Sequence, residues 1–248
     1  MADSIVSNEI KYTFAPAFAP AVVDLLGAVC RPDPAFPAAD VFSLYYDTPA
    51  RALLEEKRNS DYLKTKIRCR WYGAVRGTAM ERAVFLEAKR KEGAARDKAR
   101  VLLPLDGDTL WNTPLTDPLL CRLPEHLAEA GIPFPRPLFP LFILRYTRHR
   151  FIDPTTGARI AVDTGIHVPR TNPAFIARHN PTPLPVAVLE VKGSLREMPR
   201  SLHAVNTVHF RRETFSKYLA CHDMLFCSTG VPGGYTCFAP AAPPPHRA

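Results

Sequence analysis

Four basic side chains alternate with apolar ones in the segment 63–72. Lys64, Lys66, Arg68 and Arg70 would share one face of a β-strand, because successive side chains of a strand point to opposite faces. Same-face neighbours lie about 7 Å apart, where two unit charges repel by roughly 0.6 kcal/mol in water and about 2.4 kcal/mol at an effective dielectric constant near 20. Such a row is tolerable on a wet surface but costly in an enclosure without a bound anion.

Taken alone, this segment is equally typical of an exposed edge strand guarded by basic residues. Other segments repeat its arrangement, however, with one apolar face and one face that carries Lys or Arg and an occasional carboxylate. The repeats are Glu9 with Lys11; Phe85, Glu87, Lys89 and Lys91; Tyr146, Arg148 and Arg150; Arg159, Ala161 and Asp163; and Glu190 with Lys192. An ordinary barrel is apolar inside. The repeated pattern predicts the reverse, a charged and water-filled tunnel with helices covering its outside.

The segments that carry these groups are rich in β-branched and aromatic residues, and several alternate with period two. The predicted strands are residues 8–14, 43–46, 61–72, 83–91, 99–105, 142–152, 159–164 and 186–192. The predicted helices are residues 20–29, a turn that begins at Thr48 and Pro49 with Asp47 or Thr48 as its cap, residues 117–130, and two segments within 199–224. The predicted fold class is therefore α+β, a closed eight-stranded antiparallel β-barrel with helices packed outside.

Charge and composition narrow the class of partner. The 248 residues carry a formal net charge of +8 and are 46% apolar, so the chain can build a core and is not disordered throughout. Residues 51–100 hold 15 Lys and Arg against 7 Asp and Glu, which is the whole of the excess. Such a concentrated excess points to a polyanion: nucleic acid, acidic lipid or a phosphorylated small molecule.

The rest of the composition predicts a cytoplasmic protein of one domain. The six cysteines show no Cys-x-x-Cys spacing, and the chain opens without a basic and then apolar leader, so we expect reduced structural thiols. No apolar run approaches the roughly 18 to 20 residues that span a bilayer, so we expect no membrane segment. We predict one tunnel domain over residues 1–238 and a disordered Ala/Pro-rich tail over residues 239–248. The oligomeric state stays open.

A series of short motifs follows in order along the chain. They are Glu9-Ile10-Lys11-Tyr12, Tyr45-Tyr46-Asp47-Thr48-Pro49, Lys64-Thr65-Lys66-Ile67-Arg68-Cys69-Arg70, Glu87-Ala88-Lys89, Lys98-Ala99-Arg100, Tyr146-Thr147-Arg148, Arg159-Ile160-Ala161-Val162-Asp163, Leu189-Glu190-Val191-Lys192 and Ser216-Lys217-Tyr218. Together they resemble the VTC domain, the catalytic domain of the vacuolar transporter chaperone polyphosphate polymerases and their bacterial relatives in the triphosphate tunnel metalloenzyme superfamily. The resemblance covers about residues 9–222. Each motif is weak alone, but their shared order is a strong signal.

The resemblance implies an eight-stranded tunnel that binds the triphosphate of ATP with Mn²⁺ or Mg²⁺ and moves the terminal phosphoryl group onto a growing polyphosphate chain. By motif match, the catalytic cations would be Lys11, Arg68, Arg70, Lys89, Arg148, Arg159 and Lys217. Substrate-binding positions would be Lys64, Lys66, Lys98, Arg100 and Lys192. Glu190 would be the metal ligand, with water and phosphate oxygens completing the shell.

Several assignments keep an alternative. Lys217 lies in a predicted helix and could be an ordinary surface lysine, and of Lys98 and Arg100 we expect Lys98 to point inward. Glu9 and Glu87 are better explained as ion-pair partners that orient cations than as metal ligands. The triphosphatase and adenylate-cyclase branch of the superfamily begins with Glu-x-Glu-x-Lys, whereas the first position here is Ser7. Fewer tunnel carboxylates favour the polymerase-like branch.

Two other functions compete with polyphosphate synthesis. The first is a triphosphate hydrolase of the same fold, in which water replaces the phosphate acceptor. The second is a non-enzymatic module that binds polyanions or nucleic acid, which predicts steeply salt-dependent binding and exposed stacking aromatics. Trp71, the aromatic residue of the basic segment, falls on the apolar face, so we expect no specific nucleic-acid partner.

Overall fold

A computed structural model describes residues 8–59, 62–75, 83–93, 95–177, 180–194, 197–207 and 209–226. One curved sheet of ten strands dominates it, in the order β10-β1-β9-β8-β7-β3-β4-β5-β6, with β2 paired to β7. Its strands are β1 (Asn8–Phe14), β2 (Arg31–Pro32), β3 (Ala38–Asp47), β4 (Leu63–Gly73), β5 (Phe85–Glu92), β6 (Ala95–Leu102), β7 (Phe139–Ile152), β8 (Arg159–Thr171), β9 (Ala187–Gly193) and β10 (Arg211–Arg212). All of these strands pair antiparallel with their neighbours.

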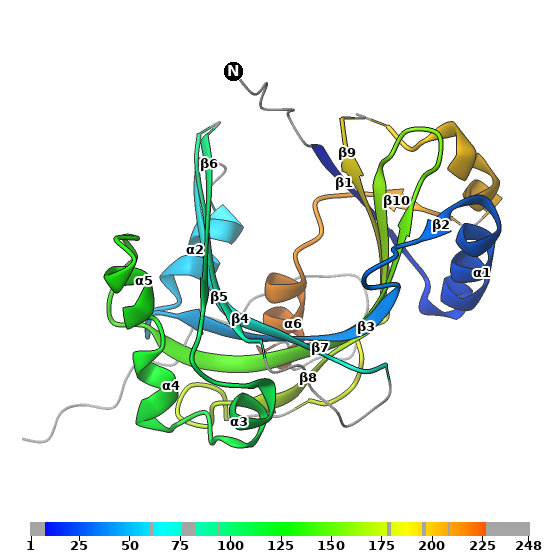
Figure 1. Cartoon of the computed structure of the whole chain (residues 1–248). Coiled ribbons are helices and arrows are strands. Elements are labelled where there is room, and N and C mark those ends of the chain that lie inside the picture. The colour runs from blue at the N-terminus through cyan, green and yellow to red at the C-terminus, as the bar shows by residue number, and fades with distance from the viewer. Residues whose placement is uncertain are drawn as a thin grey trace, which may run out of the picture.

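The sheet forms a trough whose two edges do not meet (Figure 1). Strands β4, β5 and β6 rise on one side, β1 and β9 rise on the other, and β3, β7 and β8 form the floor. The predicted closed eight-stranded barrel is therefore wrong in closure and in strand number. A physical reason lies at the edges: β6 carries Arg96, Lys98 and Arg100, and β10 consists of Arg211 and Arg212. Pairing these edges would set like charges opposite one another.

Most helices cover the convex face of the sheet. They are α1 (Ala19–Val29), α3 (Gly107–Asn112), α4 (Pro118–Arg122) and α5 (Glu125–Glu129). Two 3₁₀ segments accompany them: η1 (Pro16–Phe18) directly precedes α1, and η2 (Arg200–Thr207) lies between β9 and β10. Leu26 and Leu202 pack with Ile160 and Val191, whereas Leu110 and Leu120 pack with apolar residues of β3, β4 and β5. The helix predicted over residues 117–130 is two helices, because the chain turns at Pro124, which cannot donate the backbone hydrogen bond that a continuous helix needs.

Helix α6 (Lys217–Phe226) departs from the expectation that all helices lie outside. It lies within the curve of the sheet (Figure 1), where the Tyr218 ring stacks on Tyr45 at 4.7 Å and on Phe142 at 5.5 Å between ring centroids. Cys221 and Leu225 extend this contact into an apolar cluster on the trough floor. As a result, the first turn of α6 faces the inward charges of the strands.

Helix α2 (Ala52–Asn59) begins where the motif Asp47-Thr48-Pro49 places it. The Asp47 carboxylate accepts the backbone N–H groups of Thr48, Leu53 and Leu54 at 2.7, 2.9 and 3.0 Å, and the Thr48 hydroxyl oxygen accepts that of Ala52 at 2.9 Å. Both predicted cap residues are thus used. Three parts of the sequence predictions lie outside the described residues: the tail 239–248, the residues that precede Asn8, and Asp61 at the start of a predicted strand. No helix within the described ranges is long and apolar enough to cross a membrane.

Candidate triphosphate site

The concave face of the sheet borders a cavity of about 870 Å³, with a second cavity of about 340 Å³ beneath the first turn of α6. All thirteen residues predicted for the site line one cavity or both. The larger is lined by Lys11, Lys64, Lys66, Lys89, Lys98, Arg100, Arg148, Arg159, Glu190 and Lys192, and the smaller adds Arg68, Arg70 and Lys217. Inward alternation on separate strands therefore brings together side chains as distant in the sequence as Lys11 and Lys192, and helix α6 adds Lys217.

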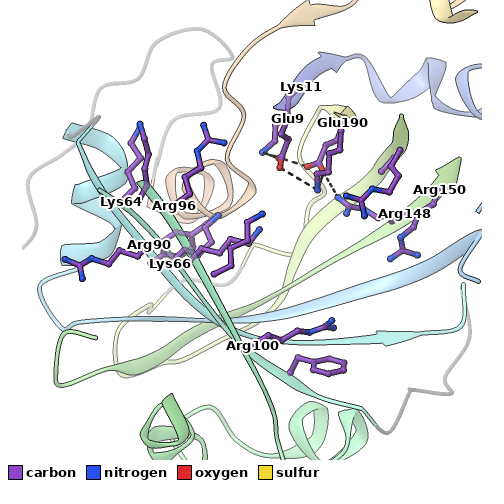
Figure 2. A pocket seen from close by; sticks show the side chains of 18 of the residues that line it. Glu9, Lys11, Lys64, Lys66, Arg90, Arg96, Arg100, Arg148, Arg150 and Glu190 are labelled. Carbon is purple, nitrogen blue, oxygen red and sulfur yellow. Dashed lines mark hydrogen bonds and ion pairs between the residues drawn. The ribbon is translucent and has the colours of Figure 1, made fainter. Parts of the chain in front are cut away.

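One side of the trough, which we call the cationic wall, consists of nine inward side chains of β4, β5 and β6, seven of which line the larger cavity. Antiparallel pairing arranges them in three cross-strand rows: Lys64, Lys91 and Arg96; Lys66, Lys89 and Lys98; and Arg68, Glu87 and Arg100. Eight of the nine are basic. Figure 2 shows Lys64, Lys66 and Arg96 on this side of the cavity, across from Glu9, Lys11 and Glu190.

Glu87 is the one carboxylate of the cationic wall. Its Oε2 accepts Arg68 Nε at 2.9 Å and Nη2 at 2.7 Å, and its Oε1 lies 3.8 Å from Arg100 Nε. Burial raises the pKa of Glu87, but Arg68 and Arg70 outweigh burial and hold that pKa at about 2. Glu87 is therefore ionised and orients the Arg68 guanidinium, which also donates to the Tyr45 hydroxyl at 3.3 Å.

The middle row of the cationic wall holds lysines in an environment that disfavours their charge. Burial, followed by Arg68 and Lys11, lowers the pKa of Lys66 well below its ordinary value. Burial, followed by Arg68 and Lys192, lowers the pKa of Lys89 to about 7. Lys192 lies across the cavity, so the two sides act electrostatically on one another. A bound polyanion would reverse this penalty because it favours the charged lysines.

The opposite side, which we call the paired wall, consists of Glu9, Lys11, Arg148, Asp163, Glu190, Lys192 and Lys217. At its centre, Glu190 accepts Lys217 Nζ at 3.0 Å and Arg148 Nη2 at 2.9 Å. Asp163 accepts Arg148 Nε at 2.5 Å and Nη2 at 2.6 Å, and it lies 2.5 Å from Lys217 Nζ. The exposed fractions are only 4% for Glu190 and 0% for Asp163. Two carboxylates and two cations thus form a compact buried network.

Both carboxylates of this network are ionised. Burial raises the pKa of Glu190, but Lys217 and Arg148 lower it well below its ordinary value. Arg148 and Lys217 likewise overcome burial and lower the pKa of Asp163. Lys217 is 9% exposed, and Asp163 and Glu190 raise its pKa against the effect of burial. The surface-lysine interpretation of Lys217 is therefore wrong.

Lys11 and Lys192 connect the network to the cavity. Lys11 Nζ lies 3.1 Å from Glu9 Oε1 and 3.9 Å from Glu190 Oε1, and it donates to the Phe215 carbonyl at 3.0 Å. Lys192 Nζ lies 3.5 Å from Glu190 Oε2 and 3.6 Å from Glu9 Oε2. Glu9 and Glu190 therefore share the same two lysines, as the dashed contacts around Lys11 illustrate (Figure 2).

Two buried donors of the smaller cavity lack a partner among the described residues. Arg70 Nε and Ser216 Oγ make no hydrogen bond, although Arg70 Nη2 donates to the Tyr146 hydroxyl at 3.2 Å. Leaving a buried donor unpaired costs about 1 to 3 kcal/mol. Both residues line the smaller cavity, and Ser216 directly precedes Lys217 at the start of α6.

The remaining predicted residues lie nearer to solvent. Arg159, at the start of β8, is exposed and lies opposite Lys192 in the strand register. Lys98 and Arg100 are also exposed, and both line the larger cavity, so the expectation that Lys98 alone points inward is too narrow. Sequence reasoning placed Asp163 on the charged face but gave it no role in the site, and it overlooked Arg96. The signal for Asp163 was its alternation with Arg159, and the signal for Arg96 was its alternation with Lys98.

The carboxylate oxygens of the site suit a divalent metal ion that binds together with a polyphosphate better than a metal ion that the protein alone would hold. No group of three or more His, Cys, Asp or Glu side chains in the described part of the chain is arranged to hold a metal. Glu9 and Glu190 offer two neighbouring carboxylates, both already contacted by lysines. Mg²⁺ is commonly held by one or two carboxylates together with substrate phosphates and water. The donor set matches that pattern.

Comparisons with known proteins identify the family of the chain. The VTC domain family model matches residues 8–226. No curated protein matches the chain. Similar solved structures include the PH1819 protein from Pyrococcus horikoshii OT3, with 13% identity, coverage of 81% of this chain and 85% of that chain, and a TM-score of 0.40. A putative adenylate cyclase from Bacillus halodurans has 13% identity, 80% and 83% coverage and a TM-score of 0.43. Another putative adenylate cyclase, from Vibrio parahaemolyticus, has 11% identity, coverage of 86% of this chain and 96% of that chain, and a TM-score of 0.44. The chain belongs to the VTC domain family.

Proposed function

We propose that the chain is a polyphosphate polymerase that requires a divalent metal ion and transfers the terminal phosphoryl group of ATP to a growing polyphosphate chain. The observation that carries this proposal is a wall of basic side chains opposite buried, ionised Glu190, with seven of its basic side chains lining the same cavity as Glu190. Membership of the VTC family supports a triphosphate-binding enzyme. The cations suit a polyanion, and the carboxylate suits the metal ion that accompanies it.

Phosphoryl transfer asks little covalent chemistry of the protein, so charge and position supply most of the catalysis. An oxygen of the terminal phosphate of the chain attacks the γ-phosphorus of ATP. The bond from γ-phosphorus to the bridging oxygen breaks, and ADP leaves with the electron pair. The attacking oxygen is already anionic, so no side-chain nucleophile is needed. Mn²⁺ or Mg²⁺, when bound with the triphosphate, would neutralise part of its charge.

The residues divide this work by their positions. Arg70 and Ser216 offer unpaired donors to phosphate oxygens, and Arg68 is already oriented by Glu87. Lys217 and Arg148 are fixed by the buried carboxylates, so they need little reorganisation when charge develops on the γ-phosphate. Glu190 and Glu9 would hold the metal ion on the paired wall. The lysine rows of the cationic wall would guide the polymer.

A triphosphate hydrolase is the second candidate, because the open trough gives water access to the same groups. Incubation of the chain with ATP and Mn²⁺, followed by gel analysis of the products, separates the two. We expect long chains that resist inorganic pyrophosphatase. Orthophosphate as the sole product would contradict the polymerase and favour the hydrolase.

Two variants give this assay its controls. Glu190→Gln keeps the shape of the side chain but removes its charge, so we expect turnover to be lost while much of the triphosphate affinity stays. Glu129→Gln is the matched control, because Glu129 is exposed on α5 and lines neither cavity. Normal activity of Glu190→Gln would remove the metal assignment.

A further inference from the structure

The inward face changes character at one level of the trough. On β4, Arg68 and Arg70 are followed by Tyr72, and on β5 Glu87 is preceded by Phe85. Arg70 and Phe85 are register partners, so Tyr72 lies one inward position beyond them. Inward positions are spaced about 7 Å apart along a strand. On both neighbouring strands, the inward side chains therefore change from charged groups to aromatic rings at the same end of the cavity.

Two arginines cover these rings. The guanidinium carbon of Arg100 lies 3.4 Å from the centroid of the Phe85 ring. That of Arg150 lies 5.5 Å from the Tyr72 ring and 6.0 Å from the Phe36 ring. Figure 2 shows Arg100 below the other labelled side chains and Arg150 at the right beside Arg148, both away from Lys64 and Arg96. We call Phe36, Tyr72, Phe85, Arg100 and Arg150 the aromatic end.

Phe36 is held at the aromatic end although its ring is 55% exposed. It lies on the short loop between β2 and β3, where Asp33 Oδ1 accepts the backbone N–H groups of Ala35 and Phe36 at 3.0 and 2.9 Å. Arg150 Nη1 donates to the Phe36 carbonyl at 3.1 Å. Among the exposed large apolar side chains of the described residues, Phe36 alone lines the larger cavity.

A triphosphate does not require these rings. The smaller cavity, which contains Arg68, Arg70 and Lys217, includes none of the three aromatic side chains of the aromatic end. Aromatic rings and guanidinium planes are the groups on which nucleobases stack. On β7, Arg148 faces the phosphate-binding network and Arg150 faces the rings, so the two surfaces are one inward step apart.

We propose that the aromatic end is a nucleobase subsite, in which the base of a nucleoside triphosphate stacks on Phe36 while its phosphates lie between the two walls. The inference rests on the proposed function and deepens it, because it names the residues that would hold the base of the donor and favour ATP over inorganic tripolyphosphate. Stacking on an aromatic ring has no specified hydrogen-bond pattern, so this subsite would distinguish a ligand that carries a nucleobase from a ligand that carries none.

The test compares ATP with inorganic tripolyphosphate, each measured with Mn²⁺ by titration calorimetry on the whole chain. Phe36→Ala should weaken ATP binding by on the order of tenfold, the effect of removing one stacking ring, and leave tripolyphosphate binding unchanged. Phe36→Trp should restore ATP binding. Phe18→Ala is the matched control, since Phe18 is 47% exposed and lines neither cavity.

The ratio of the two affinities cancels the difference in charge between the ligands. An unchanged ratio in Phe36→Ala, with both ligands still bound by the wild-type protein, would overturn the nucleobase subsite alone. An equal loss for both ligands is one such case, because it leaves the ratio unchanged and would mark a general disturbance of the cavity. If the wild-type protein binds neither ligand, the proposed function fails, and the subsite fails with it.

Discussion

The two walls of the cavity solve the problem of concentrated charge in different ways. On the paired wall, Arg148 and Lys217 each contact both Asp163 and Glu190, and the resulting network is buried. On the cationic wall, eight basic side chains share Glu87 as their one inward carboxylate. The paired wall is thus preorganised by its own charges, whereas the cationic wall depends on a polyanion to offset repulsion.

This difference indicates which wall contributes to catalysis and which contributes to binding. A preorganised network costs little reorganisation when charge develops, which suits the reacting phosphate. A wall of lysines with lowered pKa values gains most when an anion arrives, which suits binding and guidance of a chain. Loss of a charge should therefore destabilise the first wall and stabilise the second.

The largest effect is expected on the paired wall. Asp163→Asn leaves Arg148 and Lys217 with one carboxylate in a buried setting, and breaking such a network costs about 3 to 5 kcal/mol. We expect the free energy of unfolding, measured in urea, to fall by that amount. A loss below 1 kcal/mol would mean that the network contributes specificity rather than stability, contrary to this comparison.

A smaller effect of opposite sign is expected on the cationic wall. Lys66→Met removes a charge that burial, Arg68 and Lys11 all disfavour, so the protein without ligand should gain about 1 kcal/mol of stability near neutral pH. Tripolyphosphate affinity should fall at the same time. Urea unfolding and calorimetry check the two arms, and destabilisation without loss of affinity would reverse the role given to this wall.

The pH dependence tests Lys89, whose pKa of about 7 lies below that of the unfolded chain. Between pH 7 and the ordinary lysine pKa, the unfolded state binds more protons, so the contribution of Lys89 makes stability rise with pH in that window. Tripolyphosphate affinity should fall over the same window as Lys89 loses its charge. Both trends should be weaker in Lys89→Met, and identical pH profiles would contradict this role.

The smallest effect is expected at Arg159, which lines the cavity but is exposed. Salt and water screen such a charge, so Arg159→Ala should weaken tripolyphosphate binding only a few-fold, corresponding to about 1 kcal/mol. The loss should shrink as salt is added. An effect as large as that of Arg68→Ala would show that the exposed rim matters as much as the buried wall.

Alternation along single strands made the inward residues predictable. The segment 63–72 placed Lys64, Lys66, Arg68 and Arg70 on one face, and the structure retains that face in β4. The cross-strand rows were not predictable, because they depend on registers such as Lys66 with Lys89, which long-range packing fixes. The gap between the two edges of the sheet, β6 and β10, was not predictable for the same reason.

Other features had weak or competing signals. The strand β10 has two residues, too few for alternation to mark it. Asp163 shared a face with Arg159, but its partner Lys217 comes from a helix, and only the docking of Tyr218 on Tyr45 brings that helix into the trough. Trp71 was correctly placed on the apolar face, where it stacks on Phe42 at 5.4 Å between ring centroids.

The most direct test locates the ligand and the metal ion together. Crystals grown with a non-hydrolysable ATP analogue and Mn²⁺, measured at the manganese absorption edge, would give the position of each. We predict the triphosphate between the cationic wall and the paired wall, with the manganese signal at Glu190. A triphosphate outside the trough, or manganese bound away from Glu190, would contradict the account.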